Sequence, residues 1–229
     1  MKRSEINNLI DDAIEFMDKM NFHLPKWAYW KPEDWKGKEV DEIVENMLGW
    51  DLTDFGSGNF EKRGLLLFTL RNGNLEKLQK ENQKGKRYAE KIMIVKENQE
   101  TPFHFHWSKI EDIINRAGGE LVIELYGSTD KEEFSDEPVI VKIDSIPRKV
   151  LPGGKVVLEP GESICLEQRV YHRFYAIDGT TLVGEVSSVN DDNTDNRFYE
   201  PLGRFPHITP DEKPRYLLVT DYKEYLFHQ

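Results

Sequence analysis

The chain has 229 residues and a net charge of −11, and its 38% hydrophobic and 32% charged residues are typical of a globular protein. This acidic balance argues against nucleic acid as a partner, because no basic stripe is present to neutralise phosphates. No apolar run reaches the roughly 18 to 20 residues of a membrane span, so we expect neither nucleic acid nor a membrane as a partner. The single cysteine, Cys165, excludes an internal disulfide, and because the first residues are too polar for a secretory signal we expect a cytoplasmic location.

The N-terminal part of the chain predicts helices. Apolar residues recur at helical spacing over about 4–21, with Ser4 as the expected N-cap. The segment 22–35 is rich in aromatic residues, and its two prolines prevent a continuous helix. These aromatic side chains need a cover, so they pack over the core, line a ligand pocket or lie in a subunit interface. A second short helix is predicted over 40–48.

From about residue 50 onward, short apolar runs alternate with turns that contain glycine or proline. Such a succession is typical of a β-sandwich or barrel. We therefore predict one mostly β domain over 1–229, in which a helical extension (1–50) packs on a barrel core (about 60–229). The predicted strands are 64–70, 88–95, 120–126, 139–143, 155–158, 163–166, 172–177 and 180–186, with turns at Gly118-Gly119 and Asp178-Gly179.

The stretch from Thr101 to Glu111 holds two histidines one residue apart. If it is extended, His104 and His106 point to the same side, because side chains alternate along a strand. Two neighbouring imidazoles make half of a metal site, and a carboxylate, Glu111, follows five residues later. The alternative is a polar strand face with two solvated histidines.

Two segments resemble the two cupin motifs, in the same order. The first is His104-x-His106, four residues, Glu111, six residues and Gly118; the second keeps the interval from Gly161 to His172. The ligand positions are present, whereas the turn positions differ. The departures are Asn98 for a glycine of the first motif, and Glu167 and Arg169 for proline and glycine of the second. The pair of motifs predicts a cupin, or jelly-roll-like, β-barrel that binds a metal.

The ligand set limits the choice of metal. Three neutral imidazoles and one carboxylate suit a divalent transition ion and leave two octahedral positions open. Calcium and structural zinc fit less well, because the set has neither a cage of carbonyl oxygens nor thiolates. Glu120 and Glu124 are rival carboxylates, and the spacing favours Glu111.

A second resemblance covers most of the chain. Three blocks resemble bacterial D-lyxose isomerases: 22–35, with Phe22-His23-Leu24-Pro25 and Pro32-Glu33-Asp34-Trp35; 101–116, with Pro102-Phe103-His104-Phe105-His106-Trp107; and 184–196, with Gly184-Glu185-Val186-Ser187-Ser188. The resemblance implies a homodimeric cupin ketol-isomerase that uses Mn²⁺ and interconverts D-lyxose and D-xylulose, often with D-mannose and D-fructose as well. It places the metal ligands on His104, His106, Glu111 and His172. Ligand type alone also allows Co²⁺, Ni²⁺ or Fe²⁺.

Isomerisation of an aldose to a ketose moves one hydrogen between C1 and C2, and protons between O1 and O2. A carboxylate can carry the carbon-bound proton, and a lysine can bind or protonate an oxygen. Glu185, in the predicted strand 180–186, is our candidate base, with an outward orientation as the alternative. Lys109 is our candidate acid or oxygen-binding group, with a solvated lysine as the alternative.

Two other functions stay open at this stage. The same ligands hold iron in cupin dioxygenases, and a non-catalytic sugar-binding cupin would keep the pocket but lack an inward base at Glu185. The acidic run 190–196 is predicted to form Asx turns, with direct sugar binding as the alternative.

Overall fold

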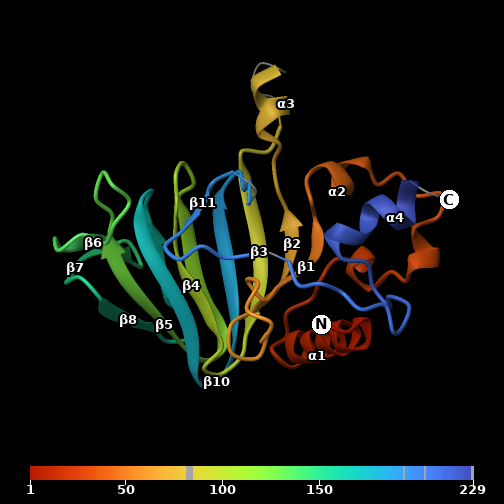
Figure 1. The fold of residues 1–229 in the computed structure, drawn as a ribbon, viewed down its shortest axis with the longest axis horizontal. Helices are drawn as coiled ribbons and strands as arrows, with labels where there is room; N and C mark the ends of the chain where they lie inside the picture. The colour runs from red at the N-terminus through yellow and green to blue at the C-terminus, as the bar shows by residue number, and fades with distance from the viewer. Residues whose placement is uncertain (81–84, 193, 204, 228–229) are drawn as a thin grey trace.

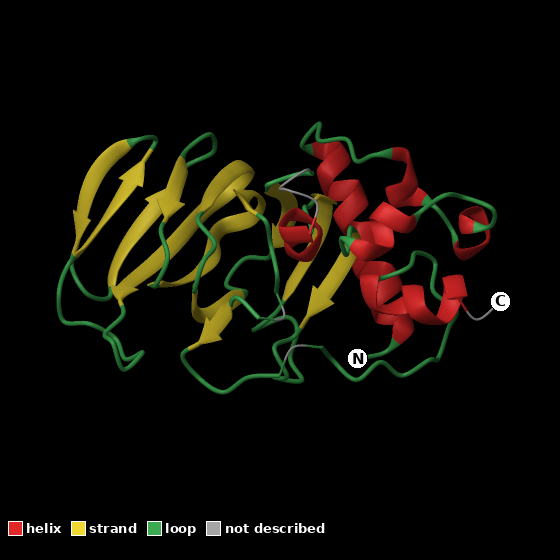
Figure 2. Cartoon of the chain, turned by 90° about the horizontal axis from the view of Figure 1, so that it is seen from above, coloured by secondary structure: helices red, strands yellow, loops and turns green. Residues whose placement is uncertain are grey.

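The computed structural model describes residues 1–80, 85–192, 194–203 and 205–227. The strands lie at one end of the molecule and most of the helical segments at the other (Figures 1 and 2). In this described part of the chain, eleven strands form one antiparallel sheet that curls into a mostly β, cupin-like barrel, so the predicted fold class is confirmed. The strands are β1 (Gly49–Thr53), β2 (Leu65–Arg71), β3 (Tyr88–Val95), β4 (Glu100–His106), β5 (Glu111–Gly127), β6 (Val139–Ile143), β7 (Ile146–Val150), β8 (Gly154–Leu158), β9 (Ser163–Leu166), β10 (Val170–Ser188) and β11 (Asn196–Phe198).

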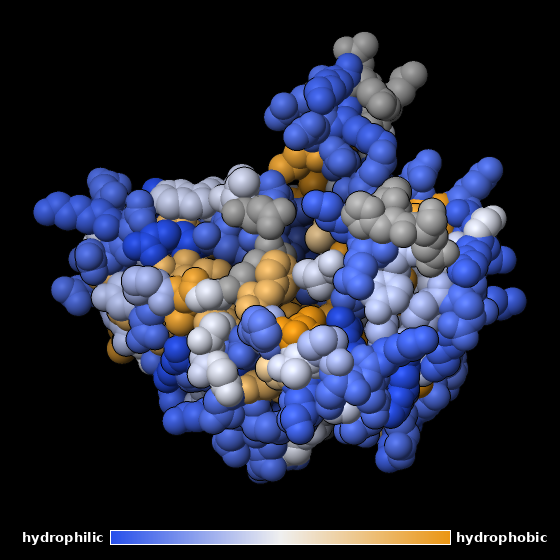
Figure 3. All heavy atoms as spheres, turned by 45° about the vertical axis from the view of Figure 1, so that its right-hand side comes forward, coloured by the Kyte–Doolittle hydropathy of each residue, from blue (hydrophilic) through white to orange (hydrophobic). Residues whose placement is uncertain are grey.

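The helical segments are short apart from the first. None of the described helices is long and apolar enough to cross a membrane. The six-residue segment α3 has no buried residue and projects from the barrel with a mostly hydrophilic surface (Figures 1 and 3). The segments are α1 (Arg3–Lys19), η1 (Lys26–Tyr29), η2 (Pro32–Trp35), α2 (Asp41–Glu45), α3 (Leu75–Lys80), η3 (Val219–Asp221) and α4 (Tyr222–Phe227).

The two long strands β5 and β10 form the centre of the barrel. They pair along nearly their whole length, from Val170 opposite Gly127 to Ser187 opposite Glu111. The first half of β10 also pairs with β4 and its second half with β3, whereas β5 pairs with β9 and then with β8. The two halves of each long strand therefore pair with different neighbours, and the strand joins the two layers of the barrel.

The turns predicted at Gly118-Gly119 and Asp178-Gly179 are wrong, because both pairs lie inside the continuous strands β5 and β10. The register shifts between Ile177 and Thr181, where the strands bend. Gly118 has a φ of +97°, and a Cβ at this position would lie 2.2 Å from the carbonyl oxygen of Thr180. Glycine is thus required at a close approach between two bent strands, not at the end of a strand.

Both faces of the central sheet are buried, which explains why its strands read as continuous apolar runs. On β3, Met93 belongs to the core inside the barrel, whereas its neighbours Ile92 and Ile94 belong to a second core outside it. That second core is closed by α1, which contributes Ile6 and Ile10, both fully buried. The first helix therefore covers the outer surface of the barrel.

The predicted first helix is confirmed, but its predicted N-cap is wrong. α1 begins at Arg3, and the hydroxyl of Ser4 donates instead to Asp211 Oδ2 at 2.6 Å. The backbone N–H of Lys2 donates to Glu5 Oε2 at 2.7 Å, so a carboxylate of the first turn satisfies the start of the helix.

The aromatic segment 22–35 packs within the chain. The ring of Trp27 lies 4.7 Å from that of Phe68 on β2, and the ring of Trp35 lies 5.3 Å from that of Tyr222. Trp35 is only 4% exposed. These aromatic side chains join the outer side of the barrel to the C-terminal helix. Of the three predicted roles, they therefore have the first, which is to pack over the core.

Candidate functional site

Three histidines meet inside the barrel. β4 places His104 and His106 on the same face, and β10 places His172 directly opposite His104 in the strand register. All three are buried, and one ring nitrogen of each lies within 4.8 Å of the others. The structure thus brings together three residues that lie up to 68 positions apart, with the spacing that a bound metal ion needs.

The backbone fixes which ring nitrogen of two histidines faces the centre. His104 Nδ1 donates to the carbonyl oxygen of Pro102 at 2.9 Å, and His172 Nδ1 donates to that of Val170 at 3.0 Å. The Nε2 atom of each ring then carries the lone pair. Within the described part of the chain, Nε2 of His172 and both ring nitrogens of His106 are buried without a hydrogen-bond partner. Buried polar atoms left in this way are what a metal ion would satisfy.

Glu111 faces the histidines with one oxygen only. Its Oε1 lies 3.3 Å from Nε2 of His106 and 3.1 Å from Nε2 of His172. Its Oε2 lies 2.7 Å from the ammonium of Lys109. The carboxylate lies outside the group of three close nitrogens, so its role as the fourth ligand stays a prediction. The rival Glu124 pairs with Arg173 at 2.8 Å, which favours Glu111 further.

The surroundings of His104, His106 and Glu111 shift their pKa values. Burial, followed by the neighbouring His172 and His106, lowers the pKa of His104 well below its ordinary value. Burial and the ammonium of Lys109 lower the pKa of His106 as well. For Glu111, burial opposes ionisation, but Lys109 and His106 lower its pKa well below the usual range. These shifts favour neutral imidazoles at His104 and His106 and an ionised carboxylate at Glu111, the forms that metal binding requires.

The two predicted catalytic side chains lie in the same buried centre. Glu185 is 4% exposed and Lys109 is 2% exposed, so neither the outward glutamate nor the solvated lysine describes the structure. Lys109 Nζ lies 3.0 Å from Glu185 Oε1. Burial alone would lower the pKa of Lys109, but Glu111 and Glu185 together raise it above its ordinary value. Lys109 is thus a charged group between two carboxylates.

Sequence reasoning missed Lys91, the second buried lysine. Lys91 lies opposite Glu185 in the register of β3 and β10, and its Nζ lies 3.3 Å from Glu185 Oε1. It is 4% exposed. The available signal was weak, because Lys91 stands beside a second charged residue, Glu90, at the start of the apolar run 92–95 of a predicted strand.

One member of the acidic run 190–196 has a clear structural role. Asp195 Oδ1 accepts hydrogen bonds from the backbone N–H and the hydroxyl of Ser108, at 2.8 and 2.7 Å, and Oδ2 accepts from the N–H of Lys109 at 3.0 Å. It holds the turn between β4 and β5, and with it the segment between His106 and Glu111. Residue 193 of this run lies outside the described residues.

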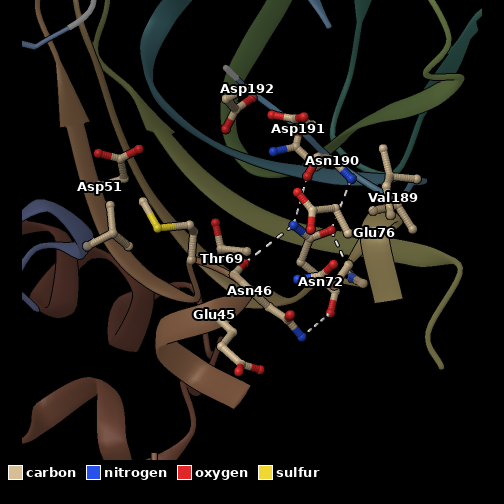
Figure 4. A pocket seen from close by; sticks show the side chains of 15 residues that line it. Glu45, Asn46, Asp51, Thr69, Asn72, Glu76, Val189, Asn190, Asp191 and Asp192 are labelled. Carbon is tan, nitrogen blue, oxygen red and sulfur yellow. Dashed lines mark hydrogen bonds between the residues drawn. The ribbon is translucent and has the colours of Figure 1, made fainter. Parts of the chain in front are cut away.

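His104 and His106 line a cavity with a mixed wall. One part is apolar and includes Phe55, Phe174 and Phe198, whereas the other carries the two lysines and Glu185. Such a wall suits a ligand that has both hydroxyl groups and C–H faces. A wider hollow lies beside the cavity and shares Asp51 and Asp192 with it (Figure 4).

Comparison with known proteins gives one consistent family. The model of the D-lyxose isomerase family matches residues 1–222. A D-lyxose/D-mannose isomerase of Escherichia coli O157:H7 is 44% identical over 230 residues, which cover 98% of this chain and 100% of that protein. One from Serratia proteamaculans is 42% identical over 231 residues, covering 99% and 100%.

Solved structures share the fold at much lower sequence identity. The ligand-free L-ribose isomerase of Cellulomonas parahominis superposes with a TM-score of 0.60 at 15% identity, covering 91% of this chain and 98% of that one. The L-ribose isomerase of Geodermatophilus obscurus gives a TM-score of 0.56 at 14% identity, covering 86% and 92%. At this identity the likeness shows the fold alone.

Proposed function

The chain belongs to the D-lyxose isomerase family, and from this membership we propose that it is a metal-dependent aldose–ketose isomerase acting on D-lyxose and D-xylulose. D-Mannose and D-fructose are the proposed second pair of substrates, because the relatives are named for both aldoses. The observation that carries the proposal is the buried group of three histidines beside an inward-facing carboxylate and two lysines.

The proposed metal ligands are His104, His106, Glu111 and His172, and the proposed ion is Mn²⁺. Buried nitrogens without partners and a mixed nitrogen and oxygen donor set support a divalent transition ion. When bound, such an ion would stabilise the negative charge that develops on the substrate oxygens. Co²⁺, Ni²⁺ and Fe²⁺ are its competitors for the same donors.

Glu185 is the proposed base, and its two oxygens have unequal surroundings. Oε1 lies 3.0 Å from Lys109 Nζ, 3.1 Å from the hydroxyl oxygen of Ser187 and 3.3 Å from Lys91 Nζ. Among the described residues, only Lys91 donates to Oε2, at 3.4 Å. Oε2 is therefore the oxygen that would take the proton from one substrate carbon and return it to the other, while Oε1 holds the side chain in place.

Lys109 is the proposed partner of a substrate oxygen. Its ammonium lies 2.7 Å from Glu111 and 3.0 Å from Glu185, so it stays charged at the point where the ligands and the base meet. A charged donor there would hydrogen-bond the oxygen that gains negative charge as C1 or C2 loses its proton. The buried wall would keep water from competing for that proton.

The decisive experiment loads the purified protein with Mn²⁺, adds D-lyxose and follows the appearance of D-xylulose. We expect turnover under air and equally under argon, since isomerisation consumes no oxygen. Turnover only in air would indicate a cupin dioxygenase, and binding without any turnover would indicate a sugar-binding cupin. Metal analysis of the protein as purified would identify the ion.

We also propose a homodimer and a cytoplasmic location, as the family resemblance implies. Sedimentation equilibrium of the metal-loaded protein would give the mass of the assembly, with twice the chain mass as the expected result.

A further inference from the structure

The side chain of Asn72 holds the backbone of a segment next to the active site. Asn72 is 5% exposed and follows β2. Its Oδ1 accepts the backbone N–H of Asn190 at 3.0 Å, and its Nδ2 donates to the carbonyl oxygen of Asn190 at 2.9 Å. Oδ1 also accepts the N–H of Gly73 at 2.9 Å, and Nδ2 lies 3.4 Å from the carbonyl oxygen of Asn46 (Figure 4). One buried carboxamide thus uses all of its donors and both lone-pair directions.

The side chain of Asn190 points from this clamp to the two buried lysines. Its Oδ1 accepts from Lys91 Nζ at 2.8 Å and from Lys109 Nζ at 3.3 Å. Both ammonium groups in turn contact Oε1 of Glu185, at 3.3 and 3.0 Å. A continuous set of hydrogen bonds therefore runs from Asn72 through Asn190 to the proposed base.

Each of the two lysines lies near two carboxylates, so a neutral acceptor beside them affects the positions of their ammonium groups. Lys91 lies between Glu185 and Asp192, which is 3.6 Å away, and Lys109 lies between Glu185 and Glu111. Ion pairs are non-directional, so either ammonium can shift toward its other carboxylate at little electrostatic cost. The amide oxygen of Asn190 adds a directed hydrogen bond to both ammonium groups without adding charge.

We propose that Asn72 is a positioning residue for the isomerisation. It fixes Asn190, and through the Asn190 side chain it keeps Lys91 and Lys109 against Glu185. The inference rests on the proposed function for its catalytic consequence, whereas the clamp itself is a property of the fold.

Asn72→Ala tests the clamp. We expect kcat to fall about tenfold, because a displaced base loses its approach to the substrate carbon, while KM stays within about twofold. Bound Mn²⁺ per chain should be unchanged, since Asn72 contacts no proposed ligand. Asn46→Ala is the matched control: Asn46 donates to the carbonyl oxygen of Asn72 at 3.1 Å but leaves the Asn72 side chain and Asn190 in place, so its kcat should equal that of the wild type.

Asn190→Ala gives a second route that does not disturb the clamp. It keeps the backbone groups that Asn72 holds and removes only the acceptor of the two lysines. If Asn72 acts through that acceptor, the double variant should lose little more kcat than Asn190→Ala alone. If the effects of the two single substitutions on kcat are fully additive in the double variant, the proposal is overturned, because a role of Asn72 in general stability would give that result.

Hydrogen exchange gives a readout that does not depend on turnover. In Asn72→Ala, peptides covering 186–192 should exchange at least about fivefold faster than in the wild type, because the Asn190 N–H has lost its acceptor. Unchanged exchange would overturn the clamp whether or not the enzyme is active. An inactive wild type with the expected change in exchange would instead refute the proposed function and leave the clamp standing.

Discussion

At the scale of single residues, the two oxygens of Glu185, the proposed base, have unequal hydrogen-bond partners. Lys109 and the hydroxyl of Ser187 donate to Oε1 at 3.0 and 3.1 Å, whereas the ammonium of Lys91 lies almost equally far from both oxygens, 3.3 Å from Oε1 and 3.4 Å from Oε2. The arrangement therefore leaves one oxygen available for proton transfer.

Glu185→Gln tests this role. The amide has nearly the same shape but cannot accept the proton, so kcat should fall by about 10³-fold or more, within the range that general base catalysis supplies. Metal content should stay at the wild-type level, because Glu185 is not among the proposed ligands. The measurement is the steady-state rate with D-lyxose, beside metal analysis of the same preparation. A variant that keeps at least half of the wild-type kcat would remove Glu185 from the mechanism.

His172→Ala tests the metal centre. We expect the variant to lose bound Mn²⁺ and activity together, because one of three close nitrogens is gone. Its circular dichroism should remain that of a β-protein, since the apolar core of the barrel does not depend on the ion. His23→Ala is the matched control, because His23 is exposed and lies near Asp18 instead. Unfolding of His172→Ala would make the metal structural and weaken the catalytic argument.

Sequence spacing found the histidines but could not find Lys91 as a partner of the base. His104 and His106 point to the same side of any extended strand, because side chains alternate along it. The contact of Lys91 with Glu185, residues that lie 94 positions apart, instead depends on the pairing of β3 with β10. Register between distant strands is set by the whole barrel, so it cannot be read from either segment alone.

At the scale of elements, β10 shows what a local pattern misses. Asp178-Gly179 reads as a turn, yet the chain continues as one strand of 19 residues. A positive φ at both residues gives a bend, and β5 bends beside it at Gly118. Local sequence gives the unusual backbone conformation, but only pairing along both halves decides between a bend and a turn.

The loop between β5 and β6 is held to the barrel by stacked aromatic rings. Phe134 lies between Tyr126, at 4.2 Å and 12°, and Tyr199, at 3.8 Å and 8°. The edges of Phe103 and Tyr171 approach the same ring at 5.1 and 5.2 Å. Phe103 is the neighbour of His104, so this stack covers the side of β4 that faces away from the metal centre.

Phe134→Ala should lower the free energy of unfolding by about 2 to 3 kcal/mol, somewhat less than for a fully buried phenylalanine, because the ring is only partly buried. Urea unfolding followed by tryptophan fluorescence would measure it. Phe134→Tyr keeps the stacked ring and serves as the control, with a loss below about 1 kcal/mol. A loss of the same size in both variants would show that stacking is not what stabilises this loop.

At the scale of the whole molecule, a buried ion pair joins the first helix to the C-terminal segment. Arg3 Nη1 donates to Asp221 Oδ2 at 2.9 Å, and Nη2 donates to Oδ1 at 2.7 Å. Asp221 Oδ2 also accepts the backbone N–H of Leu218 at 2.9 Å. Both charged residues are 7% exposed. The two ends of the described chain therefore lock together beside the barrel, on elements that carry no residue of the proposed site.

Arg3→Met should destabilise the protein by about 3 to 5 kcal/mol, because it leaves the carboxylate of Asp221 buried without its partner. The double variant Arg3→Met/Asp221→Leu should recover most of that loss, since it removes both charges and fills the space with apolar atoms. The midpoint of thermal unfolding would report both changes. At 25 °C the folded single variant should keep the wild-type kcat and its bound Mn²⁺, because neither residue lines the cavity of the metal centre. If the single variant unfolds at the same temperature as the wild type, the ion pair does not stabilise the contact between the two ends of the chain. If the variant stays folded but loses Mn²⁺, the N-terminal helix supports the site more directly than its contacts indicate.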